Sequence, residues 1–224
     1  MFSQIKKLLK IGQTDLSTTN NLWELFQKGQ YDEAIEGAKP YLNHKTKFLA
    51  KDTSKLIGQC LFRQKQYDEA LQYFQKATLY DVTVNDFFNV ASAATLSHKI
   101  KIGREAFNQA INLQIEKEGK EQPSVPYMHL YYAYALKDVG EYQLSFEQIE
   151  ILRNIYEQLK ITDLTFLHIR GVPPLSHTME IAIDVLSKLN SEVNVTKWID
   201  DLSKKIDQDG QEYLSKIKQQ TTNH

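Results

Sequence analysis

The chain has 224 residues, 42% of them hydrophobic and 25% charged, so it is long enough to bury a core in one domain or in a short repeat array. Its 27 lysines and arginines balance 28 acidic residues, which predicts no global field that would attract nucleic acid or an anionic membrane. The longest apolar run, residues 130–136, is far shorter than the roughly 18 residues of a membrane-spanning helix, so we expect no membrane crossing.

Residues 1–16 predict a short N-terminal helix with apolar side chains along one face. Lysines occur early, but the segment lacks the continuous apolar stretch and the cleavage site of a secretory signal. We expect this helix to cover the open end of the core. The alternative is a membrane-surface anchor, which three lysines support only weakly. Cys60 is the single cysteine, so the chain cannot form an internal disulfide, and a cytoplasmic location is expected.

One five-residue phrase occurs twice in the chain. Gln-Tyr-Asp-Glu-Ala stands at residues 30–34 and again at 66–70, and internal repeats of roughly 20–50 residues are typical of solenoids. Residues 53–79 have the apolar spacing of two amphipathic helices that are joined by a tight turn. Gly58 and Ala70 would let these two helices approach closely, because a larger side chain would force the backbones apart.

The second copy of the phrase lies in a segment that resembles a tetratricopeptide repeat, a helix-turn-helix unit of about 34 residues. The order and spacing of seven residues carry the resemblance: Ile57, Gly58, Leu61, Tyr67, Ala70, Phe74 and Ala77. Less regular units follow the same pattern, and in one of them Gly103 stands where alanine is usual. The resemblance implies an all-α fold, a right-handed alpha-alpha superhelix of about four repeats at residues 17–50, 51–83, 84–117 and 126–160.

The segments outside these units are expected to be a loop and capping helices. Residues 116–126 are polar and contain one glycine and two prolines, which predicts an inserted surface loop. The last helix of the array is expected to be unusually long and to end near residue 160. Ser176 is expected to cap a helix over residues 177–189, and Gly210 to bend or divide a final amphipathic stretch. Residues 161–220 would then cap the open end of the array.

The sequence contains no motif that indicates catalysis. It has no HExxH, no glycine-rich phosphate loop, no GxSxG and no paired cysteines. His168 and His177 flank a double proline, but further ligands at a recognisable spacing are absent. Cys60 lies in an apolar helix and is expected to be a buried hydrophobe. We therefore expect neither an enzyme nor a cofactor, a metal or a small-molecule substrate.

The resemblance also implies where a partner binds. In tetratricopeptide arrays the first helix of each unit lines a concave groove, so the residues that face away from the packing within each repeat are the candidates. They are Lys55, Gln59, Phe62 and Arg63 in the second unit, Phe88 and Asn89 in the third, and Tyr127, Tyr131, Tyr134 and Asp138 in the fourth. Ser92, Thr95 and Leu130 are expected on the same faces, and Trp23 and Phe26 would extend the row. Aromatic stripes at helical spacing also fit a buried core, which is the alternative for each of these aromatic residues.

One branch of the family uses lysines, an arginine and asparagines on this face to hold the C-terminal carboxylate of a peptide. Only Lys55 and Asn89 match that pattern here, and Gln59, Tyr127 and Tyr131 depart from it. We therefore predict an aromatic groove that binds a peptide or a partner protein, since tyrosine and phenylalanine give large contact area at low rotamer cost.

Two further functions stay open from the sequence. The chain could be a dedicated chaperone or immunity protein that masks a secreted effector, which small bacterial helical-repeat proteins resemble. It could also be a peptide-responsive regulator, although such proteins usually carry an N-terminal DNA-binding module, for which the roughly 15 to 20 residues before the first repeat are too few. Neither nucleic acid nor a membrane is expected as a partner.

Overall fold

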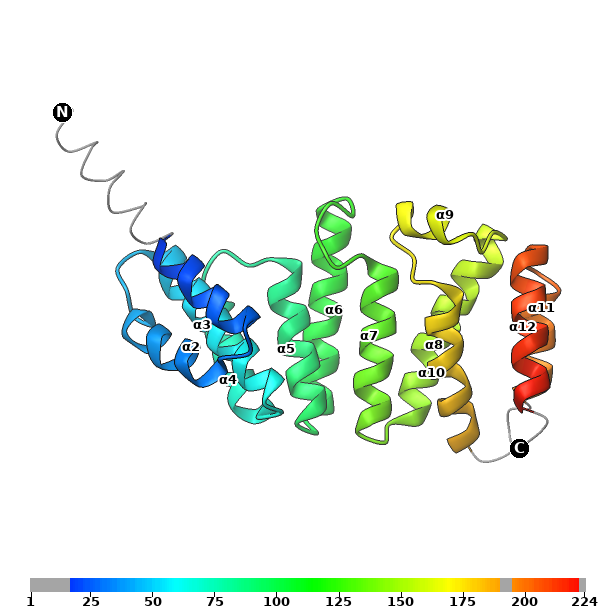
Figure 1. Cartoon of the computed structure of the whole chain (residues 1–224), viewed down its shortest axis with the longest axis horizontal. Coiled ribbons are helices and arrows are strands. Elements are labelled where there is room, and N and C mark those ends of the chain that lie inside the picture. Colours follow the sequence, from blue (N-terminus) through cyan, green and yellow to red (C-terminus); the bar gives the residue numbers. More distant parts are fainter. Residues whose placement is uncertain (1–16, 190–194, 222–224) are drawn as a thin grey trace. The chain divides into compact units, whose positions relative to one another are not determined.

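The computed structural model describes residues 17–189 and 195–221, and within these ranges every regular element is a helix (Figure 1). The predicted all-α class is thus confirmed. The chain forms two compact units, an N-terminal unit (Met1–Leu113) and a C-terminal unit (Gln114–His224). The helix that was predicted for residues 1–16 lies outside the described residues. None of the described helices combines the length and the apolarity that crossing a bilayer requires.

Consecutive antiparallel helices build the N-terminal unit. A helix over residues 17–27 is followed by α2 (Tyr31–Ala38), the short 3-10 helix η1 (Lys39–Tyr41), α3 (Lys47–Arg63), α4 (Tyr67–Ala77), α5 (Val84–Leu96) and α6 (Ile100–Glu116), which runs into the C-terminal unit. The pair formed by α3 and α4 corresponds to the two amphipathic helices that the sequence predicts.

Gly58 and Phe74 set the closeness of α3 and α4. A Cβ atom at Gly58 would lie 2.6 Å from the Phe74 ring, so only glycine leaves room for that ring. Phe74 and Ala70 are both fully buried at this contact. The predicted role of Gly58 is confirmed, because this glycine leaves room for the aromatic side chain of the other helix.

The turns of four successive helix pairs share one backbone conformation. The turn residue two positions before the second helix has a positive φ in each case, and these residues are Gly29, Lys65, His98 and Gly140. A left-handed residue lets the chain leave the first helix in a single tight turn. The repeated phrase therefore follows a turn of fixed geometry, and its tyrosine begins α2 and α4.

Gly103 has a packing reason that the sequence did not reveal. A Cβ atom there would lie 2.2 Å from the Thr95 Oγ1 atom, and Thr95 is completely buried. The threonine hydroxyl of α5 thus occupies the space that the usual alanine of α6 would need.

The C-terminal unit begins with a helix pair and continues with shorter helices. Its elements are α7 (Val125–Asp138), α8 (Tyr142–Leu159), α9 (Leu164–Ile169), α10 (Leu175–Lys188), α11 (Val195–Ser203) and α12 (Gln208–Thr221). One apolar core joins them and includes Leu152, Met179, Trp198 and Leu214. Tyr156 is fully buried in this core, and its hydroxyl donates to the Pro173 carbonyl oxygen over 2.8 Å.

Two predicted boundaries in this unit are wrong. Helix α10 begins at Leu175 with Pro174 as its N-cap, so Ser176 lies inside the helix and does not cap it. Gly210 neither bends nor divides the last stretch, because the chain leaves α11 at Ser203 and re-enters a helix at Gln208. Asp207 supplies the cap that makes this possible, since its Oδ1 atom accepts the backbone N–H of Gly210 over 3.1 Å.

Candidate functional site

Polar side chains link the first helices of successive repeats in the N-terminal unit. Trp23 donates its indole N–H to Asp52 Oδ2 over 3.0 Å. Gln59 donates its amide to Asn89 Oδ1 over 3.1 Å, which joins α3 to α5. Two predicted site residues, Gln59 and Asn89, are thus brought together. They contact each other, so part of their hydrogen-bonding capacity is already used within the chain.

Asp86 is the centre of a buried ionic cluster on the same side of α3. Its carboxylate accepts the backbone N–H and the hydroxyl of Thr83 over 2.9 and 2.8 Å, which completes a capping box at the start of α5. Lys51 Nζ lies 2.6 Å from Oδ2, and Lys55 Nζ lies 3.3 Å from Oδ1. Burial alone would raise the pKa of Asp86, but Lys51, Lys55 and Thr83 together lower it. The predicted site residue Lys55 therefore holds a structural carboxylate.

An open hollow of about 340 Å³ lies beside this ionic cluster. It is lined by Lys47, Phe48, Lys51, Asp52, Lys55, Tyr80 and Asp81. Phe48 is 51% exposed although it is a large apolar side chain. We call this feature the Phe48 hollow. It combines aromatic surface from Phe48 and Tyr80 with three lysines, which suits an apolar side chain flanked by acidic or carbonyl groups.

The two phenylalanines predicted for the groove differ in their exposure. Phe88 is only 7% exposed, and its ring centroid lies 6.5 Å from that of Phe107. Its prediction as an exposed groove residue is wrong, because α6 covers it. Phe62 is half-buried, with its ring 5.2 Å from Tyr67 and 6.3 Å from Phe74. Phe62 therefore packs one part of its ring against α4.

Other residues of the predicted row divide between surface and core. Arg63 is exposed at the last position of α3. Thr95 and Leu130 are buried, so they cannot face a groove. Trp23 and Phe26 are half-buried and meet edge to face, with ring centroids 5.4 Å apart. The N-terminal part of the predicted row is therefore less aromatic at its surface than the sequence indicates.

In the C-terminal unit, α7 presents an aromatic pair. The rings of Tyr127 and Tyr131 are 5.8 Å apart, and Tyr131 is 50% exposed. Tyr134 is half-buried, and its hydroxyl donates to the His177 carbonyl oxygen of α10 over 3.3 Å. Burial raises the pKa of Tyr134, which keeps the hydroxyl protonated as a donor. The tyrosine pair is thus the accessible aromatic surface of α7.

Ion pairs border the tyrosines at the end of α7. Lys137 Nζ lies 3.3 Å from Asp138 and 3.1 Å from Asp184 of α10. The same lysine stands over the ring of Tyr134, 5.9 Å from its centroid. Asp138, a predicted site residue, is exposed. It therefore contributes negative charge beside the aromatic surface rather than a buried anchor.

Phe48, Lys51 and Tyr80 were missed from the sequence. The second unit was expected to begin at residue 51, whereas α3 begins at Lys47 and so carries Phe48 in its first turn. Thr46 has the extended backbone of an N-cap residue but makes no side-chain capping bond. The signal that could have found Phe48 is its helical spacing with Asp52, Lys55 and Gln59 on one side of the helix.

The groups with chemical reactivity are buried or dispersed. Cys60 is fully buried, and burial raises the pKa of its thiol to about 11. His129 is buried with Nδ1 2.9 Å from Gln148 Oε1, and burial lowers its pKa. His168 and His177 are exposed. Across residues 17–189 and 195–221, no three His, Cys, Asp or Glu side chains gather closely enough to hold a metal ion.

The reaction rate of the buried Cys60 thiol measures how often the N-terminal unit unfolds locally. We expect alkylation of the native protein at pH 8 to be slower by at least about a thousandfold than in denaturant, because the thiol is inaccessible and almost fully protonated. Mass spectrometry of the protein after timed exposure to iodoacetamide measures this ratio. Rapid native labelling would contradict the burial of Cys60.

A family model described as tetratricopeptide repeat matches residues 55–81. A similar solved structure is that of YrrB, described as a TPR protein with an unusual peptide-binding site. The two sequences are 11% identical, and the TM-score is 0.49. The matched region covers 84% of this chain and 93% of the YrrB chain. No curated protein matches the sequence. The matched residues span the second half of α3 and all of α4, the pair in which Gly58 leaves room for Phe74. The segment that contains this pair is therefore similar to a tetratricopeptide repeat.

Proposed function

We propose that this protein is a non-catalytic interaction module that binds a protein or peptide partner through the first helices of its repeats. The Phe48 hollow carries this proposal, since it exposes aromatic surface on the first helix of the matched repeat. Aromatic side chains are typical anchors of binding surfaces, and exposed apolar patches often mark interaction sites. The tyrosine pair of α7 offers a second surface of the same character.

The ionic cluster beside the hollow supports the proposal. Asp86 fixes Lys51 and Lys55 at its edge, so two cations are held in place before a partner arrives. Lys51 also donates to the carbonyl oxygen of Asp81. Such pre-organisation lowers the entropy that binding costs. A terminal-carboxylate clamp is disfavoured, because Gln59, Tyr127 and Tyr131 stand where such a clamp has other polar or basic residues.

Affinity capture from the source cell tests this function. We expect the full chain to retain at least one partner that is strongly depleted on the variant Phe48→Ala. The matched control is Ile115→Ala, which removes another exposed apolar side chain (67% exposed) that belongs neither to the Phe48 hollow nor to the tyrosine pair. Quantitative mass spectrometry compares the three samples. Equal recovery of every partner on both variants would show that the hollow is not a binding surface.

A further inference from the structure

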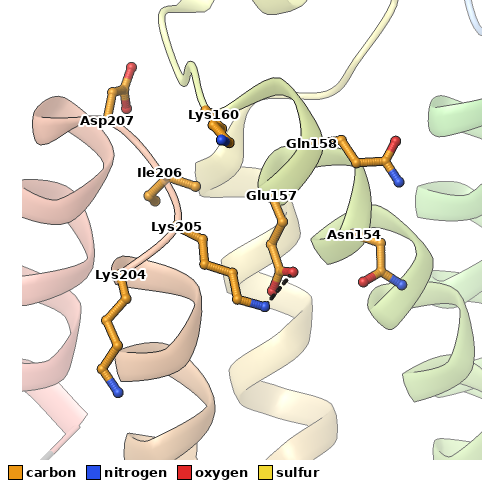
Figure 2. A pocket seen from close by; sticks show the side chains of 8 residues that line it. All are labelled: Asn154, Glu157, Gln158, Lys160, Lys204, Lys205, Ile206 and Asp207. Carbon is orange, nitrogen blue, oxygen red and sulfur yellow. Dashed lines mark hydrogen bonds and ion pairs between the residues drawn. The ribbon is translucent and has the colours of Figure 1, made fainter.

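The C-terminal unit contains an open cleft that is separate from its tyrosine pair. Its volume is about 660 Å³, and it lies between the last turns of α8 and the connection from α11 to α12 (Figure 2). The lining residues are Asn154, Glu157, Gln158, Lys160, Lys204, Lys205, Ile206 and Asp207. We call it the lysine cleft. Seven of its eight side chains are polar or charged, so its ligand must be recognised by charge and hydrogen bonds.

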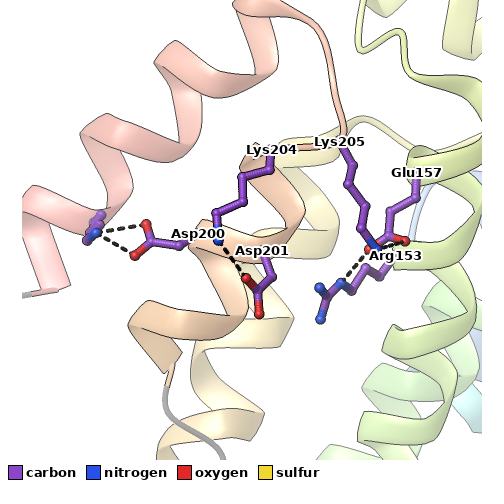
Figure 3. Close-up of polar contacts among 7 residues, drawn as sticks. Arg153, Glu157, Asp200, Asp201, Lys204 and Lys205 are labelled. Atoms are coloured by element: carbon purple, nitrogen blue, oxygen red, sulfur yellow. Dashed lines mark hydrogen bonds and ion pairs between the residues drawn. The ribbon is translucent and has the colours of Figure 1, made fainter.

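The two carboxylates of the lysine cleft are already occupied by the chain itself. Glu157 accepts Arg153 Nε over 2.9 Å and Lys205 Nζ over 2.7 Å (Figure 3). Asp207 accepts the backbone N–H of Thr162 over 2.8 Å, in addition to that of Gly210. Burial alone would raise the pKa of both carboxyl groups, but these hydrogen bonds lower it. Both stay ionised, and their oxygens face donors of the protein.

The lysines are better able to accept a ligand. Lys160 and Lys204 are exposed. Lys204 pairs with Asp201 over 2.9 Å on the surface of α11 (Figure 3), and exposed pairs of this kind are weak in water. The lining contains three lysines and two carboxylates, so its net charge is positive. Anionic groups are therefore the complementary ligands.

Amide side chains add a second recognition element. Asn154 and Gln158 lie one turn apart on α8, and both are exposed and belong to the lining of the lysine cleft. Each amide offers a donor and an acceptor, which match the carbonyl oxygen and the N–H of a peptide backbone. A single carboxylate or phosphate would fill only a small part of about 660 Å³. The cleft is thus better suited to a chain segment than to a small anion.

We propose that the lysine cleft binds an acidic peptide segment of a protein partner. Carboxylates of the segment would pair with Lys160 and Lys204, while Asn154 and Gln158 hold its backbone. Ile206 is buried in the floor of the cleft. Every lining residue of the lysine cleft belongs to the C-terminal unit, whereas the Phe48 hollow belongs to the N-terminal unit, so the two sites can be tested separately.

Titration of the full chain with a short glutamate–glycine peptide tests this proposal. The comparison ligands are the same peptide with glutamine in place of glutamate, and inorganic phosphate. We expect the glutamate peptide to shift the amide resonances of Asn154 and Gln158 in ¹H–¹⁵N spectra, and to bind at least about tenfold more tightly than either comparison ligand. Rising salt concentration should weaken its binding.

Charge reversal supplies the decisive variant. The double variant Lys160→Glu/Lys204→Glu should weaken peptide binding at least about tenfold. Lys188→Glu/Lys216→Glu changes the net charge equally at exposed lysines outside the cleft, and should leave the affinity within about twofold. The milder pair Lys160→Gln/Lys204→Gln should lose affinity in the same direction. These lysines are exposed, so circular dichroism should show an unchanged fold.

Several outcomes would overturn the proposal. They are an absence of binding to the wild-type chain at millimolar peptide, equal binding of the glutamine peptide, tighter binding of phosphate, and equal losses in the two charge-reversal variants. Phe48→Ala should leave the affinity for the glutamate peptide unchanged. Failure at the lysine cleft is therefore distinguishable from failure at the Phe48 hollow.

Discussion

Replacing Phe74 by alanine is expected to lower the free energy of unfolding of the N-terminal unit by about 3–5 kcal/mol, because a fully buried ring is removed from the contact between α3 and α4. In the wild-type chain, Gly58→Ala should also destabilise this unit, by about 1–3 kcal/mol, since its methyl group would meet the Phe74 ring at 2.6 Å. Native-state labelling of Cys60 measures both free energies.

The double variant tests the geometry of this contact. The three nearest atoms that a Cβ at Gly58 would meet all belong to Phe74, so Gly58→Ala should become neutral or stabilising once the ring is absent. Alanine is the better helix former by about 1 kcal/mol, which favours this reversal of sign. Additive losses in the double variant would contradict the close approach at Gly58.

Asp86→Asn is expected to destabilise the N-terminal unit by about 3 kcal/mol at pH 7, since it leaves two lysines without their buried counter-charge and weakens the cap of α5. Urea denaturation followed by circular dichroism measures the loss. Asp81→Asn is the matched control, because its side chain is exposed, and it should change stability by less than about 0.5 kcal/mol.

The same carboxylate predicts a pH dependence. Its native pKa is lowered, so its contribution is complete above the unfolded pKa, near 3.9, and is lost as the pH falls toward the native value. Asp86→Asn should therefore show a flatter fall in stability than the wild type between about pH 5 and pH 3. Parallel curves for the two proteins would contradict the ionised state of buried Asp86.

The α3–α4 pair could be predicted from the sequence because its contact is local and uses distinctive residues. The sequence places three residues at the spacing that a close helix pair requires, and all three are buried: Gly58, Ala70 and Phe74. Phe88 could not be assigned in the same way. Helical spacing gives the side of a helix on which a residue lies, but it does not say that Phe107 of α6 covers that side.

The sites depend on contacts that a repeat pattern does not encode. Phe48 lies in the first turn of α3, upstream of the residues that carry the repeat signature. Glu157 and Lys205 meet although they are 48 positions apart in the sequence, and neither belongs to a recognisable motif. Such surfaces arise where the repeats differ from one another, so their assignment required the positions of side chains.

Calorimetric titration of the captured partner tests the central claim of a binding surface on the first helices. We predict that Phe48→Ala raises the Kd at least about tenfold, corresponding to more than about 1.4 kcal/mol, whereas Ile115→Ala leaves it within about twofold. A Kd that stays within about twofold for Phe48→Ala, with the fold intact, would contradict the assignment of the Phe48 hollow as the binding surface.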